Sequence, residues 1–354
     1  MNGVRSFLRH ASVLALLAVL AAALGASTAS SRTSDLTNPK HFFWAPGQNP
    51  SGTVADSTAN DLIYHGGNAG SGAIGVETKP AVYLIYWGPQ WATGFTTEDT
   101  GGKLYSSKTL QTYVNSFFGG VGGSPWANIQ TQYCKDVLPG STTCVGGSGF
   151  ITNPTGQLKG VWTDPTAVPD DIIGLGLAEN LVDDPIAQEA MRASAHFKYD
   201  ANATYIVLTP LTAIATGQPV YCGYHTQTTS VNGIGNPYRI QYAFIPWLNE
   251  NWPGVGTGGC GMHNVNATSD AFGNGVFDGY SIVTGHEYAE AVTDPDNFLT
   301  DQDGWNDVQG SENGDKCAWL DTQNIKLGSH LFAVQPLWSN EAYDATGNGC
   351  VVSR

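Results

Sequence analysis

The chain is poor in positive charge. Its 354 residues include 15 Lys and Arg against 30 Asp and Glu, which gives a formal charge of −15 and a pI near 4.7. A protein that binds nucleic acid needs a basic face for the phosphates, and this composition does not supply one. Hydrophobic residues make up 41% and include 10 Trp, 15 Tyr and 13 Phe, enough for a sizeable core. The composition therefore predicts an acidic globular protein and argues against nucleic acid as a partner.

Long apolar runs are also scarce, and the strongest one lies at the N-terminus. Arg5 and Arg9 precede the apolar residues 13–24, and small residues follow. This is the order of a secretory signal peptide, and the run is shorter than the roughly 20 residues of a membrane span. An uncleaved anchor is the alternative interpretation. We predict a signal peptide over residues 1–29, a secreted, extracellular protein, and no membrane contact after its removal.

The sequence has no Cys-x-x-C spacing, which argues against cysteine zinc sites and thioredoxin-like chemistry. Six cysteines in an exported chain indicate disulfides instead. The sequence alone cannot choose among the pairings. Proximity along the chain favours Cys134–Cys144, Cys222–Cys260 and Cys317–Cys350. A G-x-S-x-G motif is absent as well, so a serine nucleophile of the α/β-hydrolase kind lacks its signature.

Ser, Thr, Asn and Pro dominate residues 30–60, which we interpret as a linker or short pro-segment. Residues 61–354 show no internal repeat and predict one domain. The apolar runs at residues 81–87, 205–208 and 241–245 predict buried strands.

Helical spacing is found in two other segments. Residues 104–118 predict a helix that stops at the glycine pair Gly119-Gly120. Residues 170–197 predict one or two helices interrupted near Pro185. The whole pattern predicts an α+β fold, a single disulfide-stapled domain with a mixed sheet.

One further segment, residues 278–293 (DGYSIVTGHEYAEAVT), predicts a helix capped by Asp278. His286 and Glu290 are four residues apart, so they lie on one face, one turn apart. Glu287 points about 100° around the helix from His286. We therefore expect an imidazole and a carboxylate to be placed together, as in the active-site helix of zincins.

The segment containing His286, Glu287 and Glu290 is a variant of the H-E-x-x-H motif, in which the outer residues bind zinc and the inner Glu is the base. A carboxylate is also a zinc ligand, so Glu290 can replace the second His. Its negative charge makes a bound water less acidic and favours a harder ion such as manganese. The alternative is a structural role, with His286 held by a carboxylate and Glu290 on a solvated face.

A third ligand is expected downstream. Glu312 follows Glu290 by 22 residues, in a gluzincin-like order of two helical ligands and a later Glu. Asp315 would then hydrogen-bond His286 from outside the ligand set and fix its tautomer. His65, His225 and His263 lie beside glycines or cysteines and are more often structural than metal-binding, although His225 or His263 facing a cleft is the alternative.

Five aspartates crowd residues 294–307, after the predicted helix: Asp294, Asp296, Asp301, Asp303 and Asp307. Carboxylates at this density suit calcium, but the spacing does not fit an EF-hand. A calcium site is one interpretation and a solvated acidic loop is the other.

Several blocks between residues 61 and 320 resemble segments of a known family. They are Tyr64-His65-Gly66-Gly67, the strand 81–87 with Gly88, Tyr205-Ile206-Val207-Leu208-Thr209, Cys222-Gly223-Tyr224-His225, the helix with His286, Glu287 and Glu290, and the segment with Glu312, Asp315 and Cys317. Together they resemble the phosphate-induced, EXORDIUM-like family of secreted proteins. The resemblance implies an extracellular or wall-associated protein of one domain, and it implies that His286, Glu290, Glu312 and Asp315 form one site. The C-terminal third departs from the plant pattern, so a role in plant growth is not implied.

The leading hypothesis is a secreted metal-dependent hydrolase, a zinc metallopeptidase acting on a protein or peptide. His286, Glu290 and Glu312 would hold the metal, and Glu287 would be the general base. The alternative is a non-catalytic EXORDIUM-like binding or signalling protein associated with a cell-wall component, because Trp and Tyr faces stack on sugars. Glycoside hydrolysis has no support beyond the many acidic residues.

Overall fold

A computed structural model describes residues 40–48, 60–67, 74–98, 102–177, 184–210, 221–231, 234–248, 259–266, 274–295 and 304–354. All of them belong to one compact unit, residues 35–354. The predicted signal peptide lies outside the described residues, and so do Asp296, Asp301 and Asp303 of the acidic loop. Within the described ranges, no helix combines the length and the apolar character that a membrane span requires.

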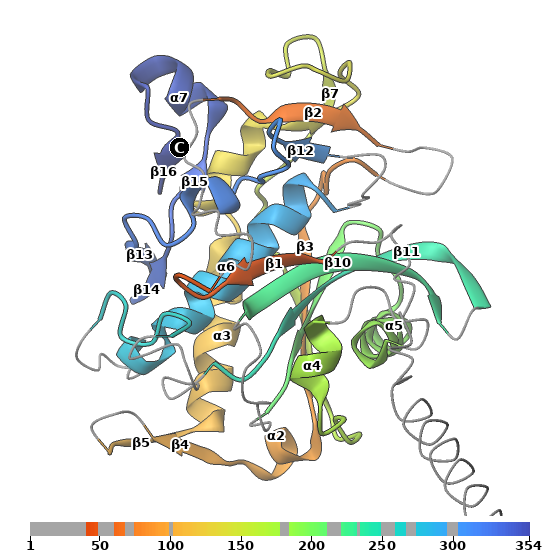
Figure 1. Ribbon diagram of the computed structural model, residues 1–354, viewed down its shortest axis with the longest axis vertical. Coiled ribbons are helices and arrows are strands. Elements are labelled where there is room, and N and C mark those ends of the chain that lie inside the picture. Colours follow the sequence, from red (N-terminus) through yellow and green to blue (C-terminus); the bar gives the residue numbers. More distant parts are fainter. Residues whose placement is uncertain are drawn as a thin grey trace, which may run out of the picture. The chain divides into compact units, whose positions relative to one another are not determined.

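A six-stranded mixed sheet forms the framework, in the order β1-β10-β11-β9-β3-β8 (Figure 1). Strands β8, β3, β9 and β11 are parallel to one another, and β10 and β1 continue the sheet antiparallel. The prediction of an α+β fold with a mixed sheet is confirmed. The strands are β1 (His41–Trp44), β3 (Ala81–Trp87), β8 (Leu158–Asp164), β9 (Ala203–Leu208), β10 (Tyr221–Val231) and β11 (Ile234–Ile245).

Alternate residues of the central strands enter two different cores. In β3, Val82 and Leu84 belong to the larger core, whereas Ala81 and Ile85 belong to the smaller one. Because side chains alternate across a strand, a strand that is buried on both faces is apolar throughout. This is why the three central strands appear in the sequence as continuous apolar runs.

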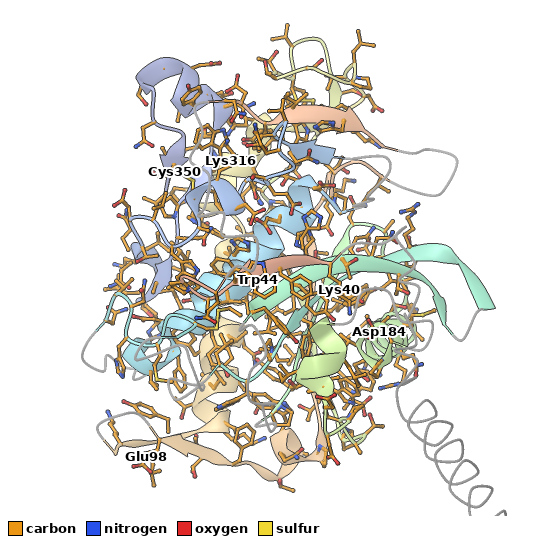
Figure 2. All side chains as sticks on the ribbon, in the orientation of Figure 1. Lys40, Trp44, Glu98, Asp184, Lys316 and Cys350 are labelled. Atoms are coloured by element: carbon orange, nitrogen blue, oxygen red, sulfur yellow. A yellow bond between two sulfur atoms is a disulfide. The ribbon has the colours of Figure 1, made fainter. Side chains whose placement is uncertain are left out.

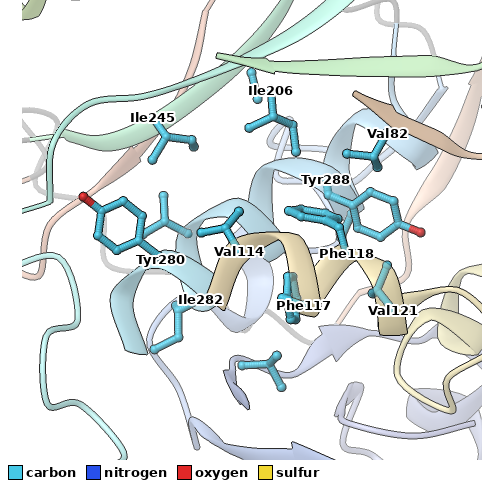
Figure 3. Packing of buried hydrophobic residues seen from close by; sticks show 14 of the residues in the cluster. Val82, Val114, Phe117, Phe118, Val121, Ile206, Ile245, Tyr280, Ile282 and Tyr288 are labelled. Atoms are coloured by element: carbon cyan, nitrogen blue, oxygen red, sulfur yellow. The ribbon is translucent and has the colours of Figure 1, made fainter. Parts of the chain in front are cut away.

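Helices cover both faces of the sheet. The larger core includes side chains of α3 (Ser107–Val121) and α6 (Asp278–Thr293), which Figure 3 shows packed against the strand residues Val82, Ile206 and Ile245. The smaller core includes side chains of α4 (Ile172–Leu177) and α5 (Pro185–Phe197). The break near Pro185 is thus confirmed, since Pro185 is the first residue of α5 and Asp184 caps that helix.

Helix α3 is shifted from its predicted position. Residues 104–106 form a short strand, and the helix starts after Ser106, whose hydroxyl accepts a hydrogen bond from the Thr109 amide. The predicted stop at Gly119-Gly120 is wrong because α3 continues through both glycines to Val121. Gly120 lies against Leu327, where a Cβ atom would come within 2.8 Å of the leucine Cβ. Gly120 therefore serves close packing, whereas an added Cβ at Gly119 would meet nothing within 4 Å.

Helix α6 has the predicted bounds, Asp278–Thr293, but its surroundings differ from the prediction. All sixteen of its residues are buried, and it packs against β10 and β11 on one side and β14 (His330–Val334) on another. Phe277 is its N-cap residue, whereas the Asp278 carboxylate accepts backbone hydrogen bonds from Val265 and Asn266. A helix without a solvated face must satisfy its polar side chains inside the protein.

The segment predicted as a linker or pro-segment contributes strand β1. Phe43 is buried, and the strand pairs with β10, so residues 40–48 belong to the folded domain. Lys40, directly before β1, forms a buried salt bridge of 3.0 Å with Asp184 at the start of α5 (Figure 2). These contacts hold β1 in place at one edge of the six-stranded sheet.

Three disulfides join Cys134 to Cys144, Cys222 to Cys260 and Cys317 to Cys350, the pairs that are nearest along the chain. Such bonds indicate folding in an oxidising compartment. The remaining elements are the strand pairs β2 (Ile63–Gly66) with β12 (Gly304–Asn306), β4 (Thr96–Glu98) with β5 (Leu104–Ser106), β6 (Cys134–Lys135) with β7 (Ser148–Phe150), β13 (Gln323–Leu327) with β14 (His330–Val334), and β15 (Leu337–Trp338) with β16 (Cys350–Val351), and the helices α2 (Pro89–Thr93), α7 (Asn340–Thr346), η2 (Ala127–Gln132), η3 (Asn274–Phe277) and η4 (Asp315–Cys317).

Candidate metal centre

Four parts of the chain bring histidines and carboxylates together beside the sheet: β1, β10, α6 and the loop that leads into η4. Figure 1 shows β1 and β10 lying next to each other over α6. The residues are His41, His225, His286, Glu287, Glu290, Glu312 and Asp315. They form three overlapping groups of three residues. Within each group, the potential ligand atoms lie within 4.8 Å of one another. Buried His and Glu side chains in this arrangement can hold a metal ion.

The first group joins helix α6 to the η4 loop. Nε2 of His286 lies 3.0 Å from Oε2 of Glu290 and 3.8 Å from Oδ1 of Asp315. The Asp315 amide donates a hydrogen bond of 2.8 Å to Oε1 of Glu290, so the loop is tied to the helix at this point. The ring of Phe43 stacks on His286 with a centroid distance of 3.8 Å and fixes the imidazole plane.

The second group lies between the two strands and the loop. His41 and His225 face each other in the β1–β10 register. Glu312 lies between them, with Oε2 2.7 Å from Nδ1 of His41 and Oε1 3.4 Å from Nε2 of His225.

The third group links the other two through His225. Its Nδ1 lies 3.1 Å from Oε2 of Glu287 and 3.5 Å from Oε2 of Glu290. Glu287 therefore does not point away from the site, despite its rotation about the helix axis. Because β10 packs along α6, it meets the side of the helix on which Glu287 lies.

The carboxylates of α6 and η4 are electrostatically unfavourable when no cation is present. Burial raises the pKa of Glu287 to about 7, against the opposing effect of His225. Burial and the charges of Asp315 and Glu312 raise the pKa of Glu290 well above its usual range. Burial and Glu312 likewise raise the pKa of Asp315 to about 6. A cluster in which carboxylates resist ionisation is one that a bound cation would stabilise.

The three histidines differ in charge. Burial lowers the pKa of His41 and His225, but Glu312 outweighs this effect and both pKa values rise to about 9. Burial raises the pKa of Glu312, but the two histidines reverse the shift and hold it below its usual range. Burial and the nearby His225 lower the pKa of His286 to about 3, which keeps this imidazole neutral and able to ligate.

Several buried polar atoms of the site make no hydrogen bond to another described residue. They are Nε2 of His225, Nδ1 of His286, Oε1 of Glu287 and Oε1 of Glu312. An unsatisfied buried polar atom costs about 1–3 kcal/mol, so such atoms call for a partner. Imidazole nitrogen and carboxylate oxygen are the donors that zinc and related ions take. The donor set therefore fits a divalent cation.

The structure distributes the sequence-predicted residues over the three overlapping groups. It brings His286, Glu290 and Asp315 together and places Glu287 with Glu290 and His225, whereas Glu312 contacts His41 and His225. Glu290 is buried, so it does not lie on a solvated face. Two residues were not predicted as ligands. The sequence predicts His225 as a structural histidine, with a position facing a cleft as the alternative, and His41 belongs to the segment predicted as a linker or short pro-segment.

The other histidines and the acidic loop behave differently. His65 and His263 are hydrogen-bonded to the backbone oxygens of Asn306 and Asn266, as expected for structural histidines. Two of the five loop aspartates have partners of known position. Asp307 forms a 3.0 Å salt bridge with Lys316, and the Asp294 carboxylate accepts a hydrogen bond from the side-chain amide of Asn306. The prediction of calcium in this loop depends largely on aspartates outside the described residues.

Comparison of the chain with protein-family models, with curated proteins and with solved structures finds no match. The EXORDIUM-like resemblance therefore stays a prediction. The arguments about function that follow are based on the geometry and chemistry of the site.

Gly314 is a position where one added carbon atom should damage the centre. A Cβ atom there would lie 2.7 Å from Oε1 of Glu290 and 2.8 Å from Nδ1 of His286. We expect Gly314→Ala to weaken the binding of a divalent metal ion by about 10–100-fold, because it displaces both side chains. Competition with a coloured chelator would measure the affinity. Gly119→Ala is the matched control, since its Cβ would meet nothing within 4 Å; equal affinity in both variants would contradict the assignment.

Proposed function

We propose that the protein is a secreted metal-dependent hydrolase, a zinc metallopeptidase, with the ion held by His286, Glu290 and Asp315. The observation that carries the proposal is the position of Glu287. It follows a helical ligand, as the base does in the H-E-x-x-H motif, and it lies buried beside that ligand group. Three protein ligands leave a coordination position for water or substrate, as catalytic zinc sites require.

This ligand set differs from the sequence-based one in a single residue. Asp315 replaces Glu312, because Asp315 approaches His286 and Glu312 is engaged by two histidines. Asp315 is also 35% exposed at its side chain, whereas Glu290 is buried. The ligand group is therefore reached from solvent at Asp315, where a peptide could approach.

The chain's own residues supply the proton transfers. A zinc ion at this position would polarise the carbonyl of the peptide bond. Oε2 of Glu287 accepts a hydrogen bond from Nδ1 of His225, which orients the carboxylate, and Oε1 has no hydrogen-bond partner among the described residues. Oε1 can thus take a proton from the attacking water and deliver it to the leaving amine.

Metal content is the first test of this proposal. We expect the purified chain to contain stoichiometric zinc by mass spectrometry and to cleave denatured casein. Replacing His286 with Ala should remove the ion from this group and abolish cleavage, because an essential ligand is lost. His196→Ala is the matched control: this exposed histidine stacks on Trp162, outside the centre.

Two results would count against the proposal. Absence of a bound metal in the wild-type chain would reject a metal-dependent activity. Metal binding without cleavage of any protein substrate would favour the non-catalytic extracellular alternative.

A further inference from the structure

The proposed zinc ligands leave His41, His225 and Glu312 without a role in metal binding. These three residues come from different parts of the chain: β1, β10 and the loop before η4. One potential ligand atom of each lies within 4.8 Å of the others. The group is therefore a second place where three donors converge.

The β1–β10 pairing builds this group. His41 and His225 are direct partners in the antiparallel register, so their side chains project from the same face of the sheet. Their ring centroids are 5.4 Å apart. Glu312 reaches this pair with one carboxylate oxygen toward each imidazole.

Two potential ligand atoms of this group are buried and make no hydrogen bond to a described residue. Nε2 of His225 and Oε1 of Glu312 face each other at 3.4 Å, yet neither forms a hydrogen bond with a described residue. The side chains of His225 and Glu312 are buried almost completely. Buried polar atoms that make no hydrogen bond cost free energy, and a bound cation would remove this cost.

His225 is also oriented as metal-ligating histidines are. A ligating imidazole usually gives its second ring N–H to a carboxylate, which fixes the tautomer. Nδ1 of His225 lies 3.1 Å from Oε2 of Glu287, and Nε2 is directed toward Glu312. In the neutral imidazole that a bound cation would require, Nδ1 would keep its proton for Glu287 and Nε2 would carry the lone pair.

Charge balance is compatible with two ions in the centre. Glu287, Glu290, Glu312 and Asp315 bring four negative charges when they are ionised, and three of the four are buried. With one divalent ion, protons on His41 and His225 would have to balance the other two charges. A second divalent ion would take the place of those two protons and leave both imidazoles able to ligate.

We propose that His41, His225 and Glu312 hold a second divalent cation beside the zinc of the proposed hydrolase. Two imidazoles and one carboxylate are a donor set for zinc. His41 is 24% exposed at its side chain, so an ion can enter from the β1 side. Metal sites with two ions use them to stabilise the attacking and the leaving atoms of one reaction.

The number of ions bound per chain tests this proposal. The full secreted chain, with its disulfides intact, is stripped with a chelator, dialysed against zinc and analysed by mass spectrometry. We expect two zinc ions per chain in the wild type and one in His41→Gln. His286→Gln should also keep one ion, that of the second position, and His196→Gln should keep both. Circular dichroism and thermal melting show that each variant is folded, which is expected for the partly exposed His41.

Each other outcome has a definite meaning. One ion in the wild type that is retained in His41→Gln overturns the second position. One ion that is lost in His41→Gln and also in His286→Gln overturns it too, because a single ion then uses both groups. One ion that is lost in His41→Gln but retained in His286→Gln supports this position and overturns the zinc assignment of the proposed function. No bound ion overturns both.

Discussion

Replacing Glu287 with Gln is expected to lower kcat for peptide hydrolysis by about 10²–10⁴-fold, the usual contribution of a general base. Glutamine has nearly the same size, and its amide can still contact His225. It cannot take a proton from water. Zinc content should therefore stay at the wild-type value while turnover is lost.

Cleavage of a fluorogenic peptide at saturating concentration measures this effect, with zinc quantified in the same samples. Glu341→Gln is the matched control, because Glu341 is 60% exposed on α7 and pairs with Arg354. A variant with unchanged kcat would show that Glu287 is not the base. A loss of zinc together with activity would mean that Glu287 is a ligand, as in the group of His225, Glu287 and Glu290.

Lys316→Met is expected to lower the free energy of unfolding by about 3–5 kcal/mol, because it leaves a partner charge buried without its cation. Lys316 and Asp307 are fully buried, and Nζ lies 3.0 Å from the Asp307 carboxylate. Nζ also donates to Asn60 and lies 4.2 Å from the centroid of the Trp338 ring. Without the lysine, the Asp307 carboxylate keeps, within the described part of the chain, the hydrogen bonds from the Gln309 and Ser311 backbone amides.

Denaturation in guanidinium with the disulfides intact measures this loss. Lys159→Met, at an exposed lysine, should stay within about 0.5 kcal/mol of the wild type. Adding Asp307→Asn to Lys316→Met should restore part of the stability, since it removes the unpaired charge. A loss below about 1 kcal/mol in the single variant would contradict the buried ion pair as an anchor. Because Lys316 directly follows Asp315, we also expect weaker zinc binding in the destabilised chain.

Sequence periodicity predicted the elements that depend on local pattern. The bounds of β3 and α6 agree with the prediction. A continuous apolar run and the helical spacing of residues are both properties of neighbouring residues, so the sequence alone shows them. It also placed His286 and Glu290 one turn apart, which needs only the helical repeat. The start of α3 was missed, since Leu104 belongs to a strand that pairs with Thr96–Glu98.

The rest of the centre depends on contacts between distant parts of the chain. His41 meets His225 only through strand pairing across more than 180 residues, and no local pattern marks His41 as a ligand. Downstream spacing could not distinguish Glu312 from Asp315, because the turn through Gly314 decides which carboxylate reaches His286. The view that Glu290 lies on a solvated face failed for a similar reason. Helix α6 has neighbours on all sides, and one sequence cannot show that.

Strand β1 covers part of one edge of β10. It is the outermost described strand on its side of the sheet, and it pairs with β10 from Tyr221 to His225. Removal of the residues up to 48 would expose the backbone N–H and C=O groups of β10, and open edges of this kind pair with other chains. The same cut would remove Phe43 from the His286 ring and His41 from Glu312. Proteolytic trimming there is therefore expected to disrupt the candidate metal centre and to promote aggregation at the same time.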